Sequence, residues 1–224
     1  PNGYVYGVSI PRDTKSSING KNRKINFAYN AGGMELLADT ISGQLGIPVD
    51  YTVLVNLKGF QALVDTIGGV DFYIPVDMHY EDPYQNLSIH FSKGMRHLSG
   101  EEALKVVRCR SAYASQDIGR MQTQQDFLKA VAKQLMTPEI ALKLPDLCGI
   151  FINYVETDLN AGNLAWLGGE VLNMGMDNIS FATLPGEWHD PYIYLDQEEV
   201  LAMVNQYLNP YTEDRTAEDL NILT

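Results

Sequence analysis

Several features that mark common protein classes are scarce in these 224 residues. Cysteine occurs twice, at Cys109 and Cys148, which is too few for a disulfide framework and fits no zinc-ligand spacing. These two residues would pair only if the fold brought their Cβ atoms together. No apolar run reaches the roughly 20 residues that span a bilayer, and no signal peptide is visible. A small disulfide-built scaffold is therefore excluded, and the compartment stays open.

Basic residues are also few, with 16 Lys and Arg against 28 Asp and Glu and a net charge of −12. No run of Lys or Arg offers a stripe for counterion release, so we expect no nucleic-acid ligand. Between residues 93 and 133, however, eight basic residues meet four acidic ones, which gives +4 in this window and −16 elsewhere. A local basic patch on an acidic chain favours a pocket for a small anion, although a solvated helix face would give the same count.

Sequence motifs of several enzyme classes are missing. The chain has no G-x-S-x-G elbow, no P-loop, no G-x-G-x-x-G and no H-E-x-x-H. The four histidines, His79, His90, His97 and His189, lack metal-ligand spacing. These absences disfavour serine hydrolases, P-loop nucleotidases, dinucleotide-binding enzymes and zinc peptidases.

The apolar residues, 45% of the chain, are enough to bury one substantial core, so we expect a single domain over residues 1–224. Hydrophobic periodicity predicts strands at 4–10, 51–56, 70–76 and 178–184, and helices at 33–45, 59–67, 99–107, 117–136, 139–154, 160–172 and 197–208. The strand at 51–56 is apolar on both faces and is expected between two helical layers. Segments 15–23, 79–93 and 211–224 are predicted to be a polar loop, a surface excursion and an acidic tail. This succession predicts an α/β fold, a three-layer α-β-α sandwich.

The predicted helix at 117–136 has a core-facing stripe that turns polar over its first two turns. The stripe consists of Asp117 and Gln124, with Arg120 about 60° aside, followed by Phe127, Leu128, Val131 and Leu135. A polar end on a buried stripe favours a lined pocket, and the free N–H groups of a helix start favour an anion there. A frayed, hydrated helix end would give the same pattern.

Three arginines accompany that helix. Arg108 and Arg110 stand two residues apart, and in an extended segment both would point the same way. Arg12 and Asp13 follow the first predicted strand, where α/β proteins tend to bind ligands. Each pair alone is more often a surface ion pair, but their joint presence favours a phosphate site, because a guanidinium binds two phosphate oxygens at once.

Six blocks, in order, resemble the signature of LytR-CpsA-Psr domains. They are Ser9-Ile-Pro-Arg-Asp-Thr14, Lys24-Ile-Asn-Phe-Ala-Tyr-Asn-Ala-Gly-Gly33, Leu63-Val-Asp-Thr-Ile-Gly-Gly-Val-Asp71, Leu98-Ser-Gly-Glu-Glu-Ala-Leu104, Arg108-Cys-Arg110 and Asp117-Ile-Gly-Arg-Met-Gln-Thr-Gln-Gln125. The resemblance covers nearly the whole chain.

This resemblance implies a sandwich with a central mixed β-sheet, held on the extracellular face of the plasma membrane of Gram-positive cells by an anchor helix outside this chain. It implies a phosphotransferase that moves a glycopolymer, of the teichoic acid or capsular polysaccharide type, from a polyprenyl pyrophosphate carrier to peptidoglycan. The polyprenyl chain would lie in an apolar channel, and its pyrophosphate in an arginine-rich site with Mg²⁺ or Mn²⁺. A pyrophosphatase side activity is also expected.

The resemblance also assigns roles to particular residues. As catalytic residues it implies Asp13, Asp117, Arg108 and Arg120. As pyrophosphate-binding residues it implies Arg12, Arg108, Arg110, Arg120, Gln124 and Lys24, and as the metal ligand Asp13.

Two departures from the family pattern stand out. The family has a strand ending in Arg and Asp before the segment that begins at Tyr4, so we expect the domain to be truncated at its amino terminus, without one metal carboxylate. Thr123 stands where the family commonly has a basic residue. Two other functions stay open. The protein could be a non-catalytic module that binds a polyprenyl pyrophosphate or a sugar phosphate. It could also be a regulator of transcription, but its acidic net charge disfavours DNA binding.

Overall fold

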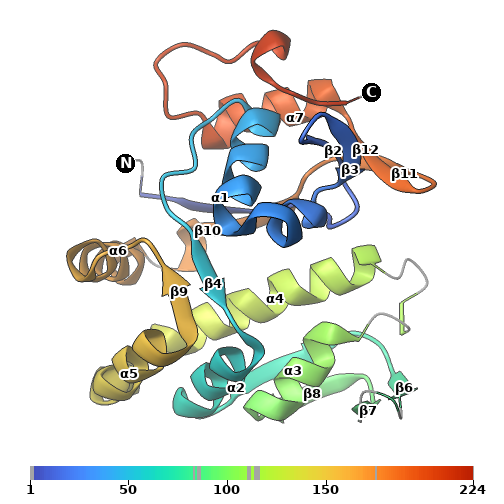
Figure 1. Cartoon of the computed structure of the whole chain (residues 1–224). Coiled ribbons are helices and arrows are strands. Elements are labelled where there is room, and N and C mark those ends of the chain that lie inside the picture. Colours follow the sequence, from blue (N-terminus) through green and yellow to red (C-terminus); the bar gives the residue numbers. More distant parts are fainter. Residues whose placement is uncertain are drawn as a thin grey trace. The chain divides into compact units, whose positions relative to one another are not determined.

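A computed structural model describes residues 3–82, 84, 87–109, 112–113, 117–174 and 176–223 (Figure 1). The side chains of residues 117, 118, 138, 141, 144, 161, 165, 171–174 and 176 are not described. Contacts divide the chain into two compact units. The middle unit contains Pro1–Tyr4 and Val53–Ile179, and the terminal unit contains Val5–Thr52 and Ser180–Thr224. The elements of both units mix helix and strand, so the predicted α/β class is confirmed.

The middle unit contains most of the helices. Its elements are β4 (Val53–Val55), α2 (Leu57–Thr66), β5 (Val70–Ile74), β6 (Met78–Asp82), β7 (Leu87–Phe91), β8 (Gly94–Leu98), α3 (Gly100–Arg108), α4 (Asp117–Leu135), η1 (Pro138–Lys143), α5 (Leu144–Tyr154), β9 (Val155–Thr157), α6 (Ala161–Met174) and η2 (Met176–Asn178). The strands pair as β4 with β9, β5 with β8 and β6 with β7, all antiparallel.

The terminal unit joins the two ends of the chain. Its elements are β1 (Val5–Ser9), β2 (Lys15–Ile18), β3 (Lys21–Lys24), α1 (Asn26–Leu45), β10 (Ile179–Thr183), β11 (Gly186–His189), β12 (Tyr192–Leu195), α7 (Gln197–Met203), the π-helical turn η3 (Val204–Leu208) and η4 (Ala217–Asp219). Here β1 pairs with β10, β2 with β3 and β11 with β12.

The core of the middle unit is built from alternating strands and helix stripes. In β5, Val70, Phe72 and Ile74 are buried, as the period of two in a half-buried strand requires. Phe127 of α4 packs against Phe72 and Phe60, with ring centroids 5.4 and 5.7 Å apart. The helices and strands predicted at 59–67, 70–76, 99–107, 117–136, 139–154 and 160–172 are thereby confirmed, with small shifts at their ends.

Two predictions for the middle unit are wrong. Strand β4 is shorter than predicted, and Val53 and Val55 are about half exposed, so the strand is not covered on both faces. Leu128 of α4 is also 49% exposed, because the buried stripe of α4 runs through Phe127 and Val131. Apolar composition alone did not predict which of these side chains are buried and which are exposed.

Three segments form hairpins that the sequence analysis did not predict. The polar loop at 15–23 is the β2–β3 hairpin, whose turn residues Asn19 and Gly20 both have positive φ, 52° and 72°. An Asn-Gly pair with this geometry is a strong hairpin signal, and its meaning was missed. The surface excursion at 79–93 contains the β6–β7 hairpin, and β11–β12 is a third.

Helix α1 is longer than predicted and kinked. The turn at Asn26 precedes the predicted helix 33–45, and the two parts meet at Gly32 and Gly33, whose dihedrals are not helical. The predicted end at Gly46 is confirmed, because Gly46 adopts a left-handed conformation with φ of 66°. A Cβ on Gly46 would also lie 2.8 Å from the carbonyl oxygen of Asp219, so the position leaves no room for a side chain.

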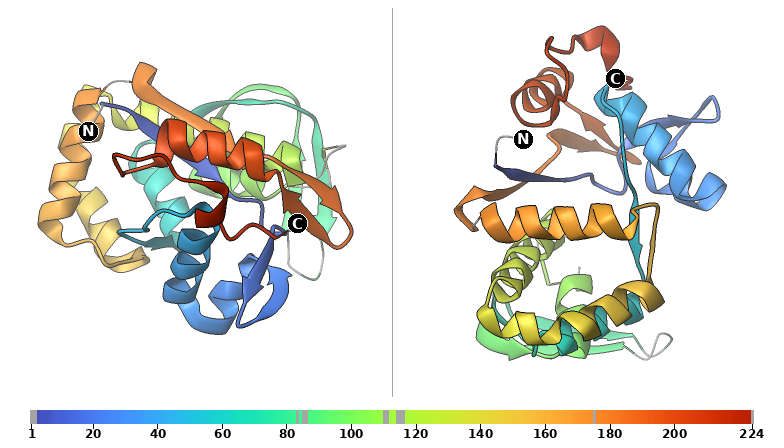
Figure 2. Two further views of the ribbon diagram at one scale, coloured as in Figure 1. Left: turned by 90° about the horizontal axis from the view of Figure 1, so that it is seen from above. Right: turned by 90° about the vertical axis from the view of Figure 1, so that its left-hand side faces the viewer.

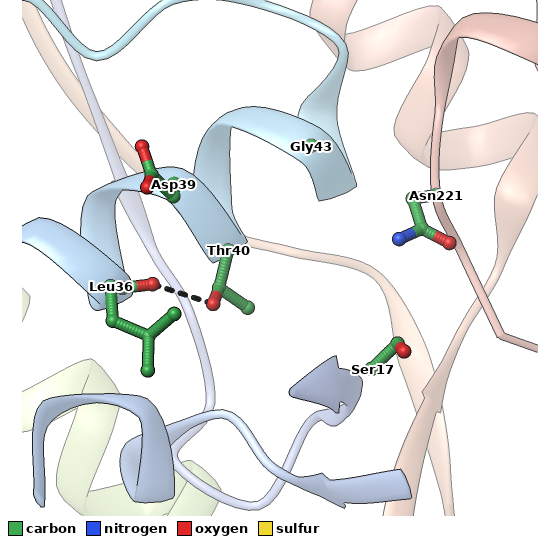
Figure 3. Close-up of a pocket in the computed structure, with 6 residues that line it drawn as sticks. All are labelled: Ser17, Leu36, Asp39, Thr40, Gly43 and Asn221. Carbon is green, nitrogen blue, oxygen red and sulfur yellow. Dashed lines mark hydrogen bonds between the residues drawn. The ribbon is translucent and has the colours of Figure 1, made fainter. Parts of the chain in front are cut away.

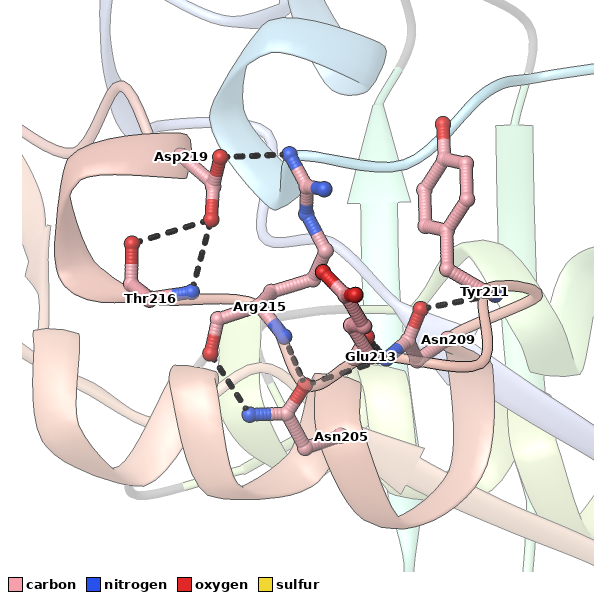
Figure 4. A network of polar contacts seen from close by, with 7 residues as sticks. All are labelled: Asn205, Asn209, Tyr211, Glu213, Arg215, Thr216 and Asp219. Atoms are coloured by element: carbon pink, nitrogen blue, oxygen red, sulfur yellow. Dashed lines mark hydrogen bonds and ion pairs between the residues drawn. The ribbon is translucent and has the colours of Figure 1, made fainter.

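The predicted acidic tail is part of the core of the terminal unit. Figure 2 shows the last residues running beside α7 and α1. The N–H of Asn221 donates to Gly43 O at 2.9 Å, and Leu220 is buried in a cluster with residues of α1, β12, α7 and η3 and with Leu184, which follows β10. Asn205 of the π-helical turn donates to the carbonyl of Arg215 and accepts from its N–H, while Arg215 pairs with Asp219 at 2.6 Å (Figure 4).

Candidate phosphate-binding residues and family

The loop after β1 forms a closed turn that presents Arg12 and Asp13. The N–H and Oγ1 of Thr14 both donate to Pro11 O, at 3.0 and 2.7 Å, and Thr14 is fully buried. Because these bonds from Thr14 to Pro11 close the turn, the two residues between them, Arg12 and Asp13, are held at its tip. The backbone of the next segment closes on the same turn, with Asn26 N donating to Arg12 O.

Asp13 lies between two cations in the terminal unit. Its Oδ1 is 3.5 Å from Arg12 Nε and 3.2 Å from Lys24 Nζ. The β2–β3 register pairs Lys24 with Lys15, which brings Lys24 back beside the turn. The structure therefore gathers three predicted residues, Arg12, Asp13 and Lys24, into one cluster with a net charge of +1.

The three side chains of this cluster differ in their exposure to solvent. The side chain of Asp13 is 18% exposed, and its Oδ1 is buried and accepts no hydrogen bond from the described residues, whereas Arg12 and Lys24 are 44% and 37% exposed. Lys24 Nζ also lies 5.6 Å from the centroid of the Trp188 ring. Trp188 was missed because β11–β12 was missed, although the alternating aromatic residues on either side of Asp190 and Pro191 were a signal for a hairpin.

In the middle unit, α3 ends at the first arginine of the predicted Arg108 and Arg110 pair. A capping box starts this helix, since Ser99 accepts from Glu102 N and Glu102 accepts from Ser99 N, as predicted. Arg108 is exposed in the last helical turn, so it lies outside the extended segment in which Arg108 and Arg110 would point the same way. The partial negative charge of a helix carboxyl end stabilises a cation there.

A hydrogen bond from one predicted site residue, Gln124, connects helix α4 to the end of α3. Gln124 Nε2 donates to Val107 O at 2.9 Å, next to Arg108. Arg120 precedes Gln124 by one helical turn, so it lies on the same side of α4 and is half-buried. The amide of Gln124 therefore links the two helices that carry Arg108 and Arg120, a role that the sequence analysis did not predict.

Part of the predicted site is not described. Arg110 and the side chain of Asp117 lie outside the described residues. Arg12, Asp13 and Lys24 belong to the terminal unit, whereas Arg108, Arg120 and Gln124 belong to the middle unit. The meeting of these two groups at one pyrophosphate stays a prediction, as does the apolar channel for a polyprenyl chain.

Thr123, which replaces a basic residue of the family pattern, is buried in α4. Its Oγ1 lies 2.5 Å from Tyr113 Oη and 3.0 Å from Gly119 O. Burial raises the pKa of the Tyr113 hydroxyl, so this group stays protonated at neutral pH. The position therefore carries a neutral hydrogen-bonded pair instead of a charge.

A small polar pocket of about 180 Å³ lies in the terminal unit, between β2, α1 and the carboxyl-terminal segment (Figure 3). It is lined by Ser17, Leu36, Asp39, Thr40, Gly43 and Asn221. None of these is a predicted site residue.

The described residues also lack a metal cluster and a membrane-spanning helix. The described residues contain no cluster of three or more His, Cys, Asp or Glu that could enclose a metal ion. Cys109 is buried and Cys148 is exposed, and the two are not paired. Among the helices of the described part, none has the length and hydropathy to cross a bilayer.

Known proteins similar to this chain belong to the family that the six sequence blocks resemble. The Bacillus cereus polyisoprenyl-teichoic acid–peptidoglycan teichoic acid transferase TagU is 33% identical over 190 residues, which are 84% of this chain and 60% of TagU. The chain thus spans less than two thirds of that relative. The crystal structure of Bacillus subtilis TagV is 28% identical, with a TM-score of 0.73 over 86% of this chain and 78% of TagV.

A second solved structure shares the fold at lower identity. The LytR-Csp2A-Psr enzyme from Actinomyces oris is 20% identical, with a TM-score of 0.78 over 97% of this chain and 83% of its own. The model of the LytR_cpsA_psr family matches residues 2–213. This match extends over both units, and the chain belongs to the LytR_cpsA_psr family.

Proposed function

We propose that this protein is a phosphotransferase that moves a phosphate-linked glycopolymer from a polyprenyl pyrophosphate carrier to peptidoglycan. The observation that carries the proposal is the relative TagU, named for a polyisoprenyl-teichoic acid–peptidoglycan transfer, which aligns with 84% of this chain. Because the acceptor in that name is peptidoglycan, it also supports a location at the cell wall, outside the plasma membrane.

Two cationic groups would bind the pyrophosphate. Arg12 and Lys24 stand on either side of Asp13, and Arg108 stands at the carboxyl end of α3 with Arg120 one turn before Gln124 on α4. Guanidinium groups bind phosphoryl oxygens through paired, charge-assisted hydrogen bonds and stabilise the charge that develops in the transition state. Both groups would be needed to clamp the two phosphates.

In the transfer itself, an acceptor hydroxyl oxygen bonds to the phosphorus nearest the sugar, and the bond from that phosphorus to the bridging oxygen breaks. The bridging oxygen leaves with polyprenyl phosphate, and the hydroxyl proton passes to Asp117 or to water. Attack by water instead of the acceptor would be the pyrophosphatase side activity.

Mg²⁺ would be held by Asp13. Its Oδ1 is a buried carboxylate oxygen that accepts no hydrogen bond from the described residues, which suits a hard cation, although Arg12 and Lys24 compete for the same charge. When bound, Mg²⁺ or Mn²⁺ neutralises charge on the pyrophosphate.

The test is turnover of a polyprenyl pyrophosphate-linked glycan by the purified protein with peptidoglycan, in Mg²⁺ and in a chelator. We expect transfer with Mg²⁺ and its loss in the chelator. Tight binding without any transfer would identify the non-catalytic binding module instead. A regulator of transcription is disfavoured by the net charge of −12.

The variant Arg108→Ala tests the anion site. Since a charge-assisted hydrogen bond contributes about 1.5–3 kcal/mol, binding of the lipid pyrophosphate should weaken at least tenfold, with the thermal midpoint little changed. Lys105→Ala is the matched control, because Lys105 lies in the same last turn of α3 but pairs with Glu101 at 2.7 Å. Wild-type affinity of Arg108→Ala in calorimetry would contradict the assignment.

A further inference from the structure

The β6–β7 hairpin brings together two histidines that are 11 residues apart in sequence. The antiparallel register pairs His79 with His90 and, two positions further along, Glu81 with Ser88. All four side chains therefore project from the same face of the hairpin. The two histidines become neighbours only through the pairing of β6 with β7. Their spacing in the sequence therefore showed no metal-ligand pattern.

The opposite face of the hairpin holds this register in place. Met78, Ile89 and Phe91 are buried in the core of the middle unit, with exposed fractions of 0%, 1% and 5%. A slip by one residue would bring His79 or His90 into that core and expose these apolar side chains. The histidine pair is thus fixed by packing and does not depend on its own contacts.

The geometry of the pair suits a metal ion. His79 Nδ1 and His90 Nδ1 share a hydrogen bond of 3.3 Å, whose proton a metal ion would replace, and the ring planes meet at 47°. Two nitrogen ligands at 2.0–2.1 Å from one tetrahedral ion are about 3.3–3.4 Å apart. An ion could therefore sit between the two rings with little movement of either.

A carboxylate orients one of the two rings. Glu81 Oε1 contacts His90 Nε2 and accepts a hydrogen bond from Ser88 Oγ at 2.7 Å. Because the ionised carboxylate only accepts, Nε2 of His90 is the donor in this contact, and in the tautomer with its proton on Nε2 the ring has a lone pair on Nδ1, the atom nearest His79. A carboxylate behind a histidine is the usual support of a metal-bound imidazole.

We propose that His79 and His90 bind one divalent transition-metal ion of the Zn²⁺ type through their Nδ1 atoms, with Glu81 as the positioning residue. The described residues contain no group of three or more His, Cys, Asp or Glu that could hold a metal ion, so the proposed site has two protein ligands among them. The site is open to solution, since His90 and Glu81 are 55% and 57% exposed.

This site differs chemically from the proposed Mg²⁺ site at Asp13. Imidazole nitrogen suits Zn²⁺, Ni²⁺ and Cu²⁺, whereas Mg²⁺ prefers carboxylate and phosphate oxygens. A bound ion would link β6 to β7 and resist their separation. The inference stands independently of the proposed transferase activity.

The experiment is calorimetric titration of the tag-free protein with Zn²⁺, in buffer with excess Mg²⁺. We expect a binding step that His79→Gln and His90→Gln each weaken at least tenfold. His189→Gln is the matched control, since His189 is exposed beside Glu187 at 3.4 Å but has no histidine partner among the described residues. A wild-type titration without a saturable step, or full binding in both hairpin variants, would overturn the proposal.

A second pair of variants tests Glu81. Glu81→Ala should weaken Zn²⁺ binding about tenfold, the usual scale for a supporting carboxylate, and Glu81→Gln should recover most of it because the amide oxygen still accepts from Nε2. Thermal unfolding without metal should be the same in both. Equal Zn²⁺ affinity of Glu81→Ala and the wild type would exclude the positioning role.

Discussion

At the scale of single residues, Asp13 is the least exposed member of its cluster with Arg12 and Lys24. Arg12 and Lys24 both approach one carboxylate oxygen, and the Thr14 turn holds the backbone beneath it. Arg12 and Lys24 are 44% and 37% exposed, so water screens their attraction to the less exposed Asp13 carboxylate. The family pattern predicted all three residues, but not their mutual contacts.

The variant Asp13→Asn separates metal binding from phosphate binding. It removes the only predicted metal ligand, so Mg²⁺-dependent transfer should fall at least tenfold. It also raises the charge of the cluster by one unit, so binding of the lipid pyrophosphate in a chelator should be retained or tighter. Asp39→Asn, on α1 of the same unit, is the control. Unchanged transfer by Asp13→Asn would remove Asp13 from the metal site.

At the scale of elements, the start of α3 shows how a local signal becomes a stable structure. Ser99 and Glu102 satisfy each other's backbone N–H groups, and Asp65 of α2 accepts from Gly100 N at 2.7 Å. The hydrogen bonds from the backbone and side chain of Ser99, with Arg96 and Lys105 nearby, lower the pKa of the Glu102 carboxyl. Such a signal is readable in sequence because it spans only four residues.

The variant Glu102→Ala should cost about 1 kcal/mol in the free energy of unfolding at pH 7. Because the folded pKa is lowered, the stabilisation is complete above the ordinary value near 4.5 and is lost as pH falls through the folded value. The difference from the wild type in urea unfolding should thus shrink in acid. Glu101→Ala, one residue away and paired with Lys105, should cost about 0.5 kcal/mol or less. A larger loss in Glu101→Ala would contradict this.

At the scale of the whole molecule, the carboxyl-terminal segment returns to the first third of the chain. Leu220 is 6% exposed, and Gly46 at the end of α1 packs against the carbonyl of Asp219. The acidic composition did not predict this packing, because part of it is formed with Gly43 and Gly46, residues about 175 positions earlier in the chain.

The variant Leu220→Ala should destabilise the protein by about 2–4 kcal/mol, because it opens a cavity in the core of the terminal unit. Leu142→Ala, at a side chain that is 87% exposed, should change the free energy of unfolding by less than about 0.5 kcal/mol. Equal midpoints of the two variants in thermal unfolding would show that residues 217–222 do not belong to the core.

The sequence by itself determined the family, the α/β class, most helices and the candidate residues. These depend on short-range patterns: the capping box at Ser99, the apolar period of α4, and the Arg12 and Asp13 pair after a strand. Even so, the Asn19 and Gly20 turn shows that a readable local signal can be missed.

Only the tertiary structure decided which residues become neighbours across the chain. The pairing of His79 with His90, the approach of Lys24 to Asp13, the bond from Gln124 to Val107 and the docking of Leu220 all join residues from different segments. Such contacts depend on strand register and on which apolar face is buried, and a one-residue change of register reverses the facing of every side chain in a strand. The hydrophobic periodicity of the sequence does not specify the register of the strands or which segments pack together.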